Sequence, residues 1–545
     1  MTHLINFLLP RLLKISKMIE EIIGLALSIC SLFSSDTPRV RSNKESLPEN
    51  TNLEFREIEN DAPRTFINKE YIDVNNGEMP FEHSLHKDTS LCGTGWYDCQ
   101  HGGTCWKSFW KCLWTNLNIV MASIIPITFA LAIVYVEMNT TYSCLEWQNH
   151  NNNSLPLFVK RAQVFGDCVE SFVLYLWFPF SIMMLFGWKE FKEKFTSALY
   201  VCVIFGELVV IYHLISFQFN FYDILSYYRI PASILFCVSL FCSGFVILYN
   251  IRACDQLVTY SNCHIIALLL MEFIFCAFIS YANRYELIPA FNGFRKKLYK
   301  FLVALTFPAL TIIPAILCKH MALRRSDEIV QPGRSFILVH VIRGHAIFIF
   351  RTMHSDFKSI SLFTGLSLFS AVSNFLKKAT QQIRYNIWKR IILKLQGLGF
   401  FQRLQVLTWD TAPARRLRAD LEIQDILFEY NTIVLSQAYL IFYQLESFEI
   451  NVRPLLLEFV KRIAIGLGIE FIFNCLSNFV QMHYYNIPIG RVWRKYWKRH
   501  LFANVVVTLT IIAYYSQDFN SVFEAHFHEM REDSVKYPIR NCSFF

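Results

Sequence analysis

Long apolar segments recur along this 545-residue chain, and each has about the length that a lipid bilayer requires. A membrane-spanning helix needs about 20 consecutive apolar residues. Six segments in the first two thirds of the chain meet this requirement: Leu117 to Val136, Val169 to Trp188, Thr196 to Phe217, Ile230 to Tyr249, Cys263 to Ala282, and Leu298 to Cys318. Because hydrocarbon offers no partner to an open backbone amide, each segment is expected to be helical.

The composition agrees with a membrane protein rather than a soluble one. Hydrophobic residues make up 54% of the chain and charged residues only 17%, with a mean hydropathy of +0.31. The formal net charge is +9, but the sequence shows no soluble domain in which basic residues accompany aromatic side chains for base stacking. We therefore expect no nucleic-acid partner, and we use the basic residues as indicators of loop orientation instead.

Five further segments are apolar but interrupted by polar or charged residues. Three lie near the end of the chain: Phe428 to Leu445, Ile463 to Met482, and Leu501 to Tyr515. Two lie between the groups, Ser335 to Phe350 and Ile360 to Leu376, and the first of these carries His340, Arg343 and Arg351. Either of these two could be interfacial, re-entrant or a polar span. They must cross together or not at all, because a single crossing would place the basic run at Lys377 outside.

Proline residues indicate where some of these helices bend. They lie in or at the ends of four predicted spans: Pro126, Pro179, Pro231, Pro308 and Pro314. A proline frees a carbonyl group of the preceding turn, which has to be satisfied by a neighbouring helix or by water. We therefore predict an all-α, polytopic integral membrane helix bundle with about 9 to 11 transmembrane helices, some of them Pro-kinked or re-entrant.

Two independent signals predict the orientation of the chain. Lys and Arg concentrate on the cytosolic side of membrane proteins. Four basic runs fall on one side: one after the second span, one after the sixth span, one at Lys377 to Lys394 and one at Arg491 to His500. The glycosylation sequons at Asn139, Asn152 and Asn541 fall on the other. We expect a cytosolic amino terminus and a lumenal or extracellular carboxyl terminus, in the plasma membrane or an endomembrane of the secretory pathway.

The same topology divides the chain into six parts. We expect an amphipathic helix at 1–35, a flexible cytosolic tail with a cysteine cluster at 36–112, a first bundle of six spans at 113–320, a basic cytosolic or interfacial region with one or two marginal membrane segments at 321–427, a second bundle of three spans at 428–516, and a lumenal or extracellular tail at 517–545.

The cysteines do not form a recognisable metal site. Cys92, Cys99, Cys105 and Cys112 are spaced by six, five and six residues, which lacks the paired spacing of zinc ribbons, so no metal is predicted. Cys144 and Cys168 bracket the first outer loop, where the compartment is oxidising. We predict a disulfide between these two cysteines.

The span from Ile463 to Met482 contains a polar stripe. Arg462, Glu470, Asn474 and Asn478 recur at four-residue intervals, with Gly466 in the same series, so they lie on one side of a helix. A charged side chain at mid-bilayer costs about 2.5 to 3.5 kcal/mol, which makes a lipid-facing position unfavourable. The stripe therefore either packs against neighbouring helices or lines a pathway.

Two more carboxyl groups lie in the middle of predicted spans, Glu207 in the third and Glu272 in the fifth. Lys and Arg are nearly absent from the same depth of the clear spans, so we expect little ion pairing there. A carboxyl group at this depth can carry a proton during transport, or it can serve as a neutral hydrogen-bond donor. We predict that these residues, with the stripe, form a pathway or a site for a substrate or ion.

No phosphate-binding loop, zinc-protease motif or nucleophile elbow occurs in the sequence, so no catalytic residue and no cofactor is predicted. The basic helix at 377–396 places isoleucines on one side and cations on the other, which indicates anionic lipids of the inner leaflet as partners. We predict a transporter or channel-like protein for an unidentified small solute, ion or lipid, and a homo-oligomer is compatible with the sequence. The alternatives are a receptor or assembly protein without a pathway, and a lipid-modifying enzyme in which His340, Arg343 and Asp356 would meet.

Overall fold

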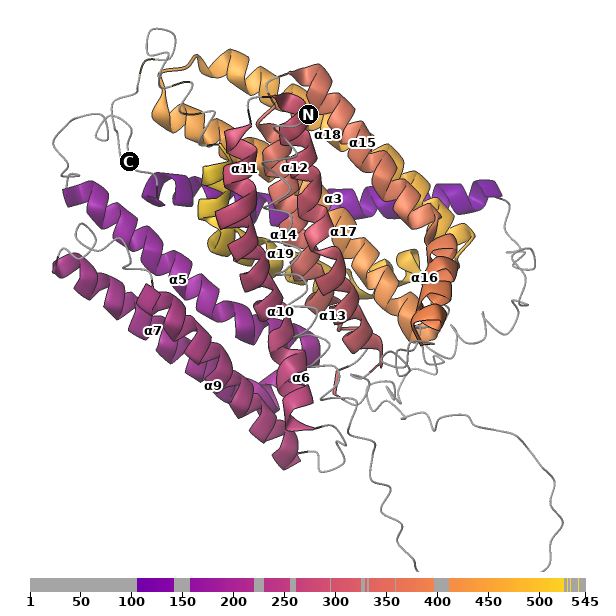
Figure 1. The fold of residues 1–545 in the computed structure, drawn as a ribbon, viewed down its shortest axis with the longest axis horizontal. Coiled ribbons are helices and arrows are strands. Elements are labelled where there is room, and N and C mark those ends of the chain that lie inside the picture. Colours follow the sequence, from indigo (N-terminus) through magenta and orange to yellow (C-terminus); the bar gives the residue numbers. More distant parts are fainter. Residues whose placement is uncertain are drawn as a thin grey trace, which may run out of the picture.

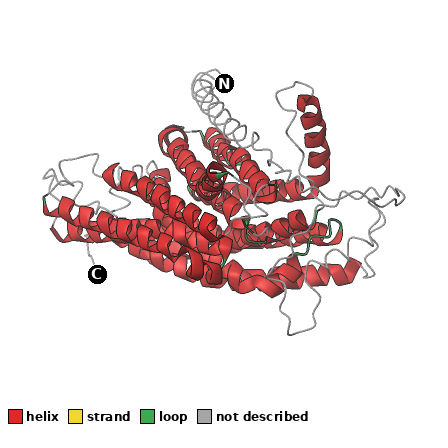
Figure 2. Cartoon of the chain, turned by 90° about the horizontal axis from the view of Figure 1, so that it is seen from below, coloured by secondary structure: helices red, strands yellow, loops and turns green. Residues whose placement is uncertain are grey.

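The computed structural model describes most of the chain from Cys105 onwards. The described residues are 105–141, 157–219, 230–254, 261–294, 296–324, 329–330, 333–357, 359–396 and 411–523, together with residues 527, 530 and 538. Within these ranges nearly every residue is helical, and Figure 2 shows the described part of the chain as helices with a few short turns. The fold is therefore an all-α helix bundle, as predicted.

Eleven long helical segments make up the described fold. They are α3 (Cys105–Thr141), α5 (Leu157–Phe186), α7 (Thr196–Gln218), α9 (Ile230–Cys254), α10 (Asn262–Ala282), α12 (Lys297–Leu310) continued by α13 (Ile312–Arg324), α14 (Phe336–Ser355), α15 (Ile360–Ala379), α17 (Ala412–Ser447), α18 (Val452–His483) and α19 (Ile489–Val522). Shorter elements are α6 (Trp188–Glu190), α11 (Ile288–Gly293), α16 (Gln381–Gln396), and π-helical turns at Phe191–Phe195 and Asn283–Leu287.

Nine helices of the described chain are long and apolar enough to cross a membrane. All six spans predicted in the first two thirds of the chain are among them, as is α18. The other two are α14 and α15, which cover the segments that the sequence left as possible interfacial or re-entrant pieces. The helices α17 and α19, which contain the predicted spans at 428–445 and 501–515, do not meet the same criterion.

The polar character of α17 follows from its position at the centre of the bundle. It packs against α3, α14, α18 and α19, and these helices converge in the middle of Figure 1. Most of its side chains are buried, including Asp420, Asp425 and Asn431. Because other helices surround α17, its polar groups can be satisfied by protein instead of meeting lipid, so it need not be apolar.

The two segments between the predicted groups differ in burial. In the most apolar stretch of α14, 89% of the residues are buried, against 22% in α15. A buried helix can carry Arg343 and Arg351 because neighbouring helices supply Asp425 and Glu470 as partners for these side chains. The α15 helix lies on the outside, along α18, as Figure 1 shows.

A second group of helices lies beside this centre. The helices α5, α7 and α9 pack side by side at the lower left of Figure 1, and α5 also contacts α19 and α3. The large apolar core joins this group to α10, α14 and α19 through rings such as Phe178, Phe273 and Phe348.

Proline breaks one span as predicted. The helix α12 ends at Leu310 and α13 begins at Ile312, between Pro308 and Pro314. Pro314 has no N–H for the carbonyl of Leu310, and the hydroxyl of Thr311 donates to the carbonyl of Pro308 at 2.9 Å. The span is therefore kinked at this point.

Candidate functional site

Buried and partly buried polar side chains follow one face of α17 across the bundle. On α17 they are Glu422, Asp425, Glu429, Ser436 and Gln437, and on the surrounding helices they are Arg343, Arg351, Ser355, Asn374, Lys378, Arg462, Glu470 and Asn474. The steps of three and four residues between Glu422, Asp425 and Glu429 keep these side chains on the same side of the helix. We call this set the polar file.

An ion pair occupies the middle of the polar file. The guanidinium of Arg351 on α14 pairs with the carboxylate of Glu470 on α18, and both side chains are almost completely buried. Glu429 of α17 lies next to this pair and interacts electrostatically with both of its members. Its carboxylate also accepts hydrogen bonds from the amides of Asn474, at 3.1 Å, and Asn374, at 3.2 Å. Four helices therefore meet at one buried charged centre.

Two more ion pairs continue the file towards one end of the bundle. Arg343 of α14 lies 2.5 Å from Asp425, and Lys378 of α15 pairs with Glu422. Glu429 interacts electrostatically with Lys378 and Asp425, so the charged centre and these pairs form one connected network. This end of the bundle is the one that carries the basic runs, which we expect to be cytosolic.

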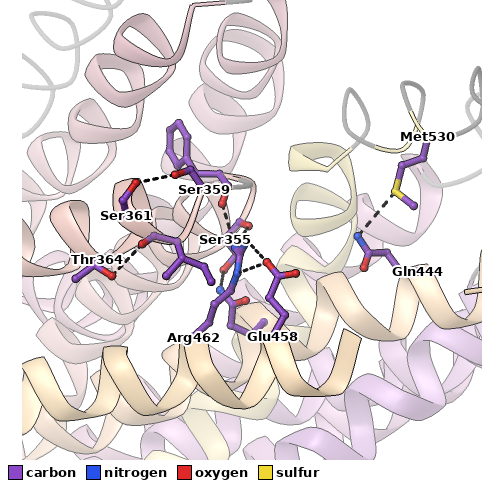
Figure 3. A network of polar contacts seen from close by, with 11 residues as sticks. Ser355, Ser359, Ser361, Thr364, Gln444, Glu458, Arg462 and Met530 are labelled. Atoms are coloured by element: carbon purple, nitrogen blue, oxygen red, sulfur yellow. Dashed lines mark hydrogen bonds and ion pairs between the residues drawn. The ribbon is translucent and has the colours of Figure 1, made fainter. Parts of the chain in front are cut away.

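Hydroxyl and amide groups continue the file in the other direction. Ser355, one turn beyond Arg351, donates to the hydroxyl of Ser436 at 3.0 Å, and Gln437 donates to Ser355 at 2.7 Å. Figure 3 shows this region, where Arg462 reaches from α18 towards the end of α14. Its guanidinium donates to the carbonyl of Phe357 at 3.0 Å and pairs with Glu458 at 2.6 Å.

A cavity lined by both polar and apolar side chains, which we call the polar cavity for its polar members, opens at this end of the file. It has a volume of about 260 Å³, and its lining includes Ser355, Asp356, Gln437, Gln444, Glu458 and Arg462. Met530 closes one side, and its sulfur accepts a hydrogen bond from Gln444 at 3.8 Å, as Figure 3 shows. The cavity is large enough for several water molecules or for a small polar solute.

The length of the file is comparable to the thickness of a membrane. Helical rise places Glu422 and Gln437 about 22 Å apart along α17. The hydrocarbon core of a bilayer is about 30 Å thick. Polar groups of the file are therefore present over a distance that approaches this thickness.

The structure brings three of the four predicted stripe residues into the file. Arg462, Glu470 and Asn474 each contact a polar group of another helix. Asn478 is buried on the same face, but neither of its amide atoms has a hydrogen-bond partner within the described residues. Gly466 allows close approach, because a Cβ atom there would lie 3.2 Å from Ile433 of α17.

The expectation that ion pairing is scarce at this depth is wrong for Glu470. Its partner Arg351 comes from α14, a segment too polar to be predicted as a clear span. A single sequence shows the carboxylate and the guanidinium 119 positions apart, and only the packing of α14 against the bundle brings them together.

Glu272 lies in a different environment. It is buried on α10 and accepts hydrogen bonds from Trp177, at 3.2 Å, and Ser181, at 3.3 Å. Trp177 also lines a largely apolar cavity of about 390 Å³ between α5, α7, α9 and α10. None of the contacts that the structure gives Glu272 joins it to the polar file.

Glu207 faces outwards from α7. Its side chain is exposed, in a row with Ile204, Leu208 and Ile211. The three predicted carboxylates therefore do not share partners: Glu470 belongs to the polar file, Glu272 to the neighbourhood of the apolar cavity, and Glu207 to the outer surface of the described chain.

The residues proposed for an enzyme do not form one pocket. Arg343 and Asp356 are 13 positions apart on or at the end of α14, which corresponds to about 20 Å along the helix. Arg343 pairs with Asp425, whereas Asp356 pairs with Lys300 at 2.9 Å. The two charged groups therefore act at opposite ends of the polar file.

Several predicted sites lie outside the described residues. This applies to Asn152, Asn541, Cys144, Cys92 and Cys99, and the side chain of Asn139 in the last turn of α3 is also not described. Because Cys144 is not described, its disulfide with Cys168 stays a prediction. Cys112 donates to the carbonyl of Cys475 at 3.4 Å. Among the described residues, no group of His, Cys, Asp and Glu could hold a metal ion.

The acidic residues of α17 were not predicted from the sequence to be site residues. Asp425 and Glu429 precede or begin the predicted span at 428–445, and their charge argued against a membrane position. A signal was present: Glu422, Asp425, Glu429, Thr432 and Ser436 alternate steps of three and four residues, the spacing of one helix face. A polar face of this kind in an otherwise apolar helix indicates burial against other polar groups.

Another ion-pair cluster closes the basic end of α17. Asp420, two residues before Glu422 and outside every predicted span, lies 2.8 Å from Arg416 and 3.0 Å from Arg499 and His500. Burial by itself would raise the pKa of Asp420, but Arg416, the hydrogen bond with His500 and Arg499 together hold it below its ordinary value. Asp420 is therefore favoured as an anion beside Arg416 and Arg499.

Comparison with known proteins supplies no further assignment, because no family model, no curated protein and no solved structure matches this chain.

Proposed function

We propose that this multi-pass membrane protein is a transporter or channel-like protein, and that a small cation or proton moves along the polar file. The observation that carries the proposal is the connected series of buried charged and polar groups on α14, α15, α17 and α18, which leads from the polar cavity to the basic end of the bundle.

The energetics of burial support this assignment over a purely structural one. Replacing a buried ion pair by well-packed apolar residues is often neutral or stabilising, so such pairs are a poor device for holding helices together. Ionisable residues inside membrane proteins are rare and commonly mark ion pathways and proton relays. The polar file contains three ion pairs and Glu429 beside them.

The charged centre suggests how a cation would be handled. Glu429 and Glu470 interact electrostatically, and Arg351 is the cation that both carboxylates face. A proton or a small cation arriving at Glu429 would reduce the repulsion between the two carboxylates. Arg351 could then move from Glu470 towards a new partner, so that binding of the ion is coupled to a rearrangement of α14 relative to α18.

Flux through reconstituted protein tests this function. The purified protein is placed in liposomes with a pH-sensitive dye inside, and proton, Na⁺ and K⁺ gradients are applied in turn. We expect a flux that the wild type supports and that Glu429→Gln abolishes, because the amide keeps the shape and one of the two accepted hydrogen bonds but cannot carry the ion. Glu449→Gln, which changes an exposed carboxylate at the end of α17, serves as control. Equal flux in protein-free and protein-containing liposomes under every gradient would contradict the proposal.

The apolar cavity supports a second candidate, a receptor for a small amphipathic ligand. Its volume of about 390 Å³ lies in the range of small-molecule sites, and aromatic side chains such as Trp177, Tyr175 and Phe236 line it. Loss of binding of a small amphipathic ligand in Trp177→Ala, together with unchanged flux in Glu429→Gln, would favour a receptor over a transporter.

A further inference from the structure

The apolar cavity between α5, α7, α9 and α10 has one polar end. Asp167, Glu170 and Ser171 line this end from the first half of α5, and His213 lines it from the last turns of α7. The Nε2 atom of His213 lies 3.2 Å from the hydroxyl oxygen of Ser171, so the two helices meet at this level. The polar end therefore lies where α5 begins and α7 ends.

The rest of the lining is apolar and largely aromatic. Trp177 follows Asp167 by ten residues, which places it about 15 Å further along α5. Its ring centroid lies 4.6 Å from that of Phe273 on α10. Between the two levels, the ring of Tyr175 lies 5.4 Å from that of Phe236 on α9. The cavity is thus amphipathic along its length, with carboxylates at one end and aromatic rings at the other.

The acidic groups determine which head group suits the polar end. Asp167 is only 7% exposed, and Glu170 is partly buried. No Lys or Arg is among the described residues that line the cavity. Both carboxylates also interact with other groups of the protein, but an ionised carboxylate has about four acceptor positions and can accept a further N–H donor. This end therefore favours a cationic head group over an anionic one.

The aromatic lining favours the same kind of head group. Aromatic rings attract an ammonium group that lies over their faces, and cages of such rings recognise organic ammonium ligands. The rings that line this cavity are those of Tyr175, Trp177, Phe236, Phe241, Phe273 and Tyr514. They also bury the apolar part of a ligand, so one cavity offers partners to both parts of an amphipathic amine.

The cavity is open to the outer surface of these helices. Phe241 of α9 is 50% exposed and Ile274 of α10 is 51% exposed, and both residues line the cavity. Because the two helices are apolar enough to lie in a membrane, this opening faces lipid. An amphipathic amine that is already dissolved in the bilayer can therefore enter the cavity from the side.

We propose that the apolar cavity binds a small amphipathic amine, with its ammonium group at Asp167 and Glu170 and its apolar part against Trp177, Phe236 and Phe273. This ligand class rests on the second candidate function, the receptor, and is independent of ion flux along the polar file.

Three ligands that differ only in their head group test the ligand class. The full-length protein in phosphatidylcholine nanodiscs is titrated calorimetrically with 4-phenylbutylamine, 4-phenylbutanol and 4-phenylbutyrate, and protein-free nanodiscs provide the blank. We expect the amine to bind at least about tenfold more tightly than the alcohol, which is roughly what one charge-assisted hydrogen bond contributes. The carboxylate should bind more weakly than the alcohol.

Three variants locate the ligand. In Asp167→Asn/Glu170→Gln, affinity for the amine should fall at least about tenfold, whereas affinity for the alcohol should change less than about twofold and so report a folded cavity. Glu193→Gln/Glu207→Gln removes two exposed carboxylates outside the cavity and should change amine affinity less than about twofold. Ala277→Trp, at an exposed position of the lining, fills the cavity and should abolish binding of all three ligands.

Two kinds of result would overturn the proposal, and they are distinguishable. Equal affinities for the amine and the alcohol, or equal losses of amine affinity in the Asp167→Asn/Glu170→Gln and control variants, would remove the ammonium preference and leave the receptor candidate standing. No binding of any of the three ligands to the wild type, or full binding by Ala277→Trp, would remove both.

Discussion

The pair between Arg351 and Glu470 decides whether the buried charges have a structural or a functional role. It joins α14 to α18, and Glu429 and Asn474 lie beside it. At this scale the sequence predicted one side correctly, since the four-residue spacing of Arg462, Glu470 and Asn474 fixes a common face. Their partners on other helices could not be predicted, because they lie on α17 and on or just after α14 and are brought near by packing alone.

Single and double substitutions of this pair have different expected effects on stability. Arg351→Met leaves the Glu470 carboxylate buried without its partner and should cost about 3 to 5 kcal/mol. Adding Glu470→Leu removes that charge and should restore most of the loss, because the site is then apolar. Thermal unfolding of both proteins in the same detergent measures these differences, and flux in liposomes should stay lost in the stable double variant.

The double variant separates the two roles. A double variant that is as unstable as Arg351→Met would show that the pair is needed for the fold. A double variant that is stable and still conducts would remove the ion pair from the proposed pathway.

At the scale of the element, hydropathy identifies helices whose surface is mostly apolar. It does not identify helices that have a buried polar face. The six predicted spans are apolar on most sides, and all of them form long helices. The helix α17 is 36 residues long but has a buried polar face, so composition alone does not assign it to the membrane. For the same reason α14, which carries Arg343 and Arg351, was not separable from an interfacial segment.

Close packing of α17 against α18 depends on Gly466. A larger side chain there would meet Ile433, whereas Gly468 has no atom within 4 Å of an added Cβ. We expect Gly466→Leu to destabilise the protein by about 1 to 3 kcal/mol through overpacking. Gly468→Leu, on the same helix, should be neutral or slightly stabilising because leucine favours helix more than glycine. Equal unfolding midpoints for the two variants would show that α17 and α18 are not in close contact.

At the scale of the whole molecule, the distribution of basic residues predicts the topology. The end of the bundle that carries the basic runs is expected to be cytosolic, and the polar cavity lies at the other end of the polar file, so the direction of the proposed pathway depends on this expectation. The orientation was predicted from the sequence through the positive-inside rule and the sequons, and it is independent of helix packing.

Glycosylation tests the orientation. We expect Asn139, Asn152 and Asn541 to face the lumen and to accept glycans, and each Asn→Gln change at an occupied site should increase gel mobility by one glycan. Mobility is compared before and after treatment with a glycosidase. A sequon engineered near Ser42, in the predicted cytosolic tail, is the control and should stay unmodified. Glycan addition at that position would reverse the topology.

The central claim is that the polar file is reached by water, and cysteine labelling in intact membranes tests it most directly. Asn474→Cys and Ser436→Cys place thiols in the file, and Ile472→Cys and Leu476→Cys place thiols on the exposed side of α18. All four are made in a background with Cys475→Ser, because this native thiol lies between positions 474 and 476 in the sequence. We expect a small, water-soluble thiol reagent to label positions 474 and 436 and to leave 472 and 476, which face lipid, unmodified. Protection of positions 474 and 436 in folded, correctly glycosylated protein would contradict a pathway and make the polar file a dry contact between helices.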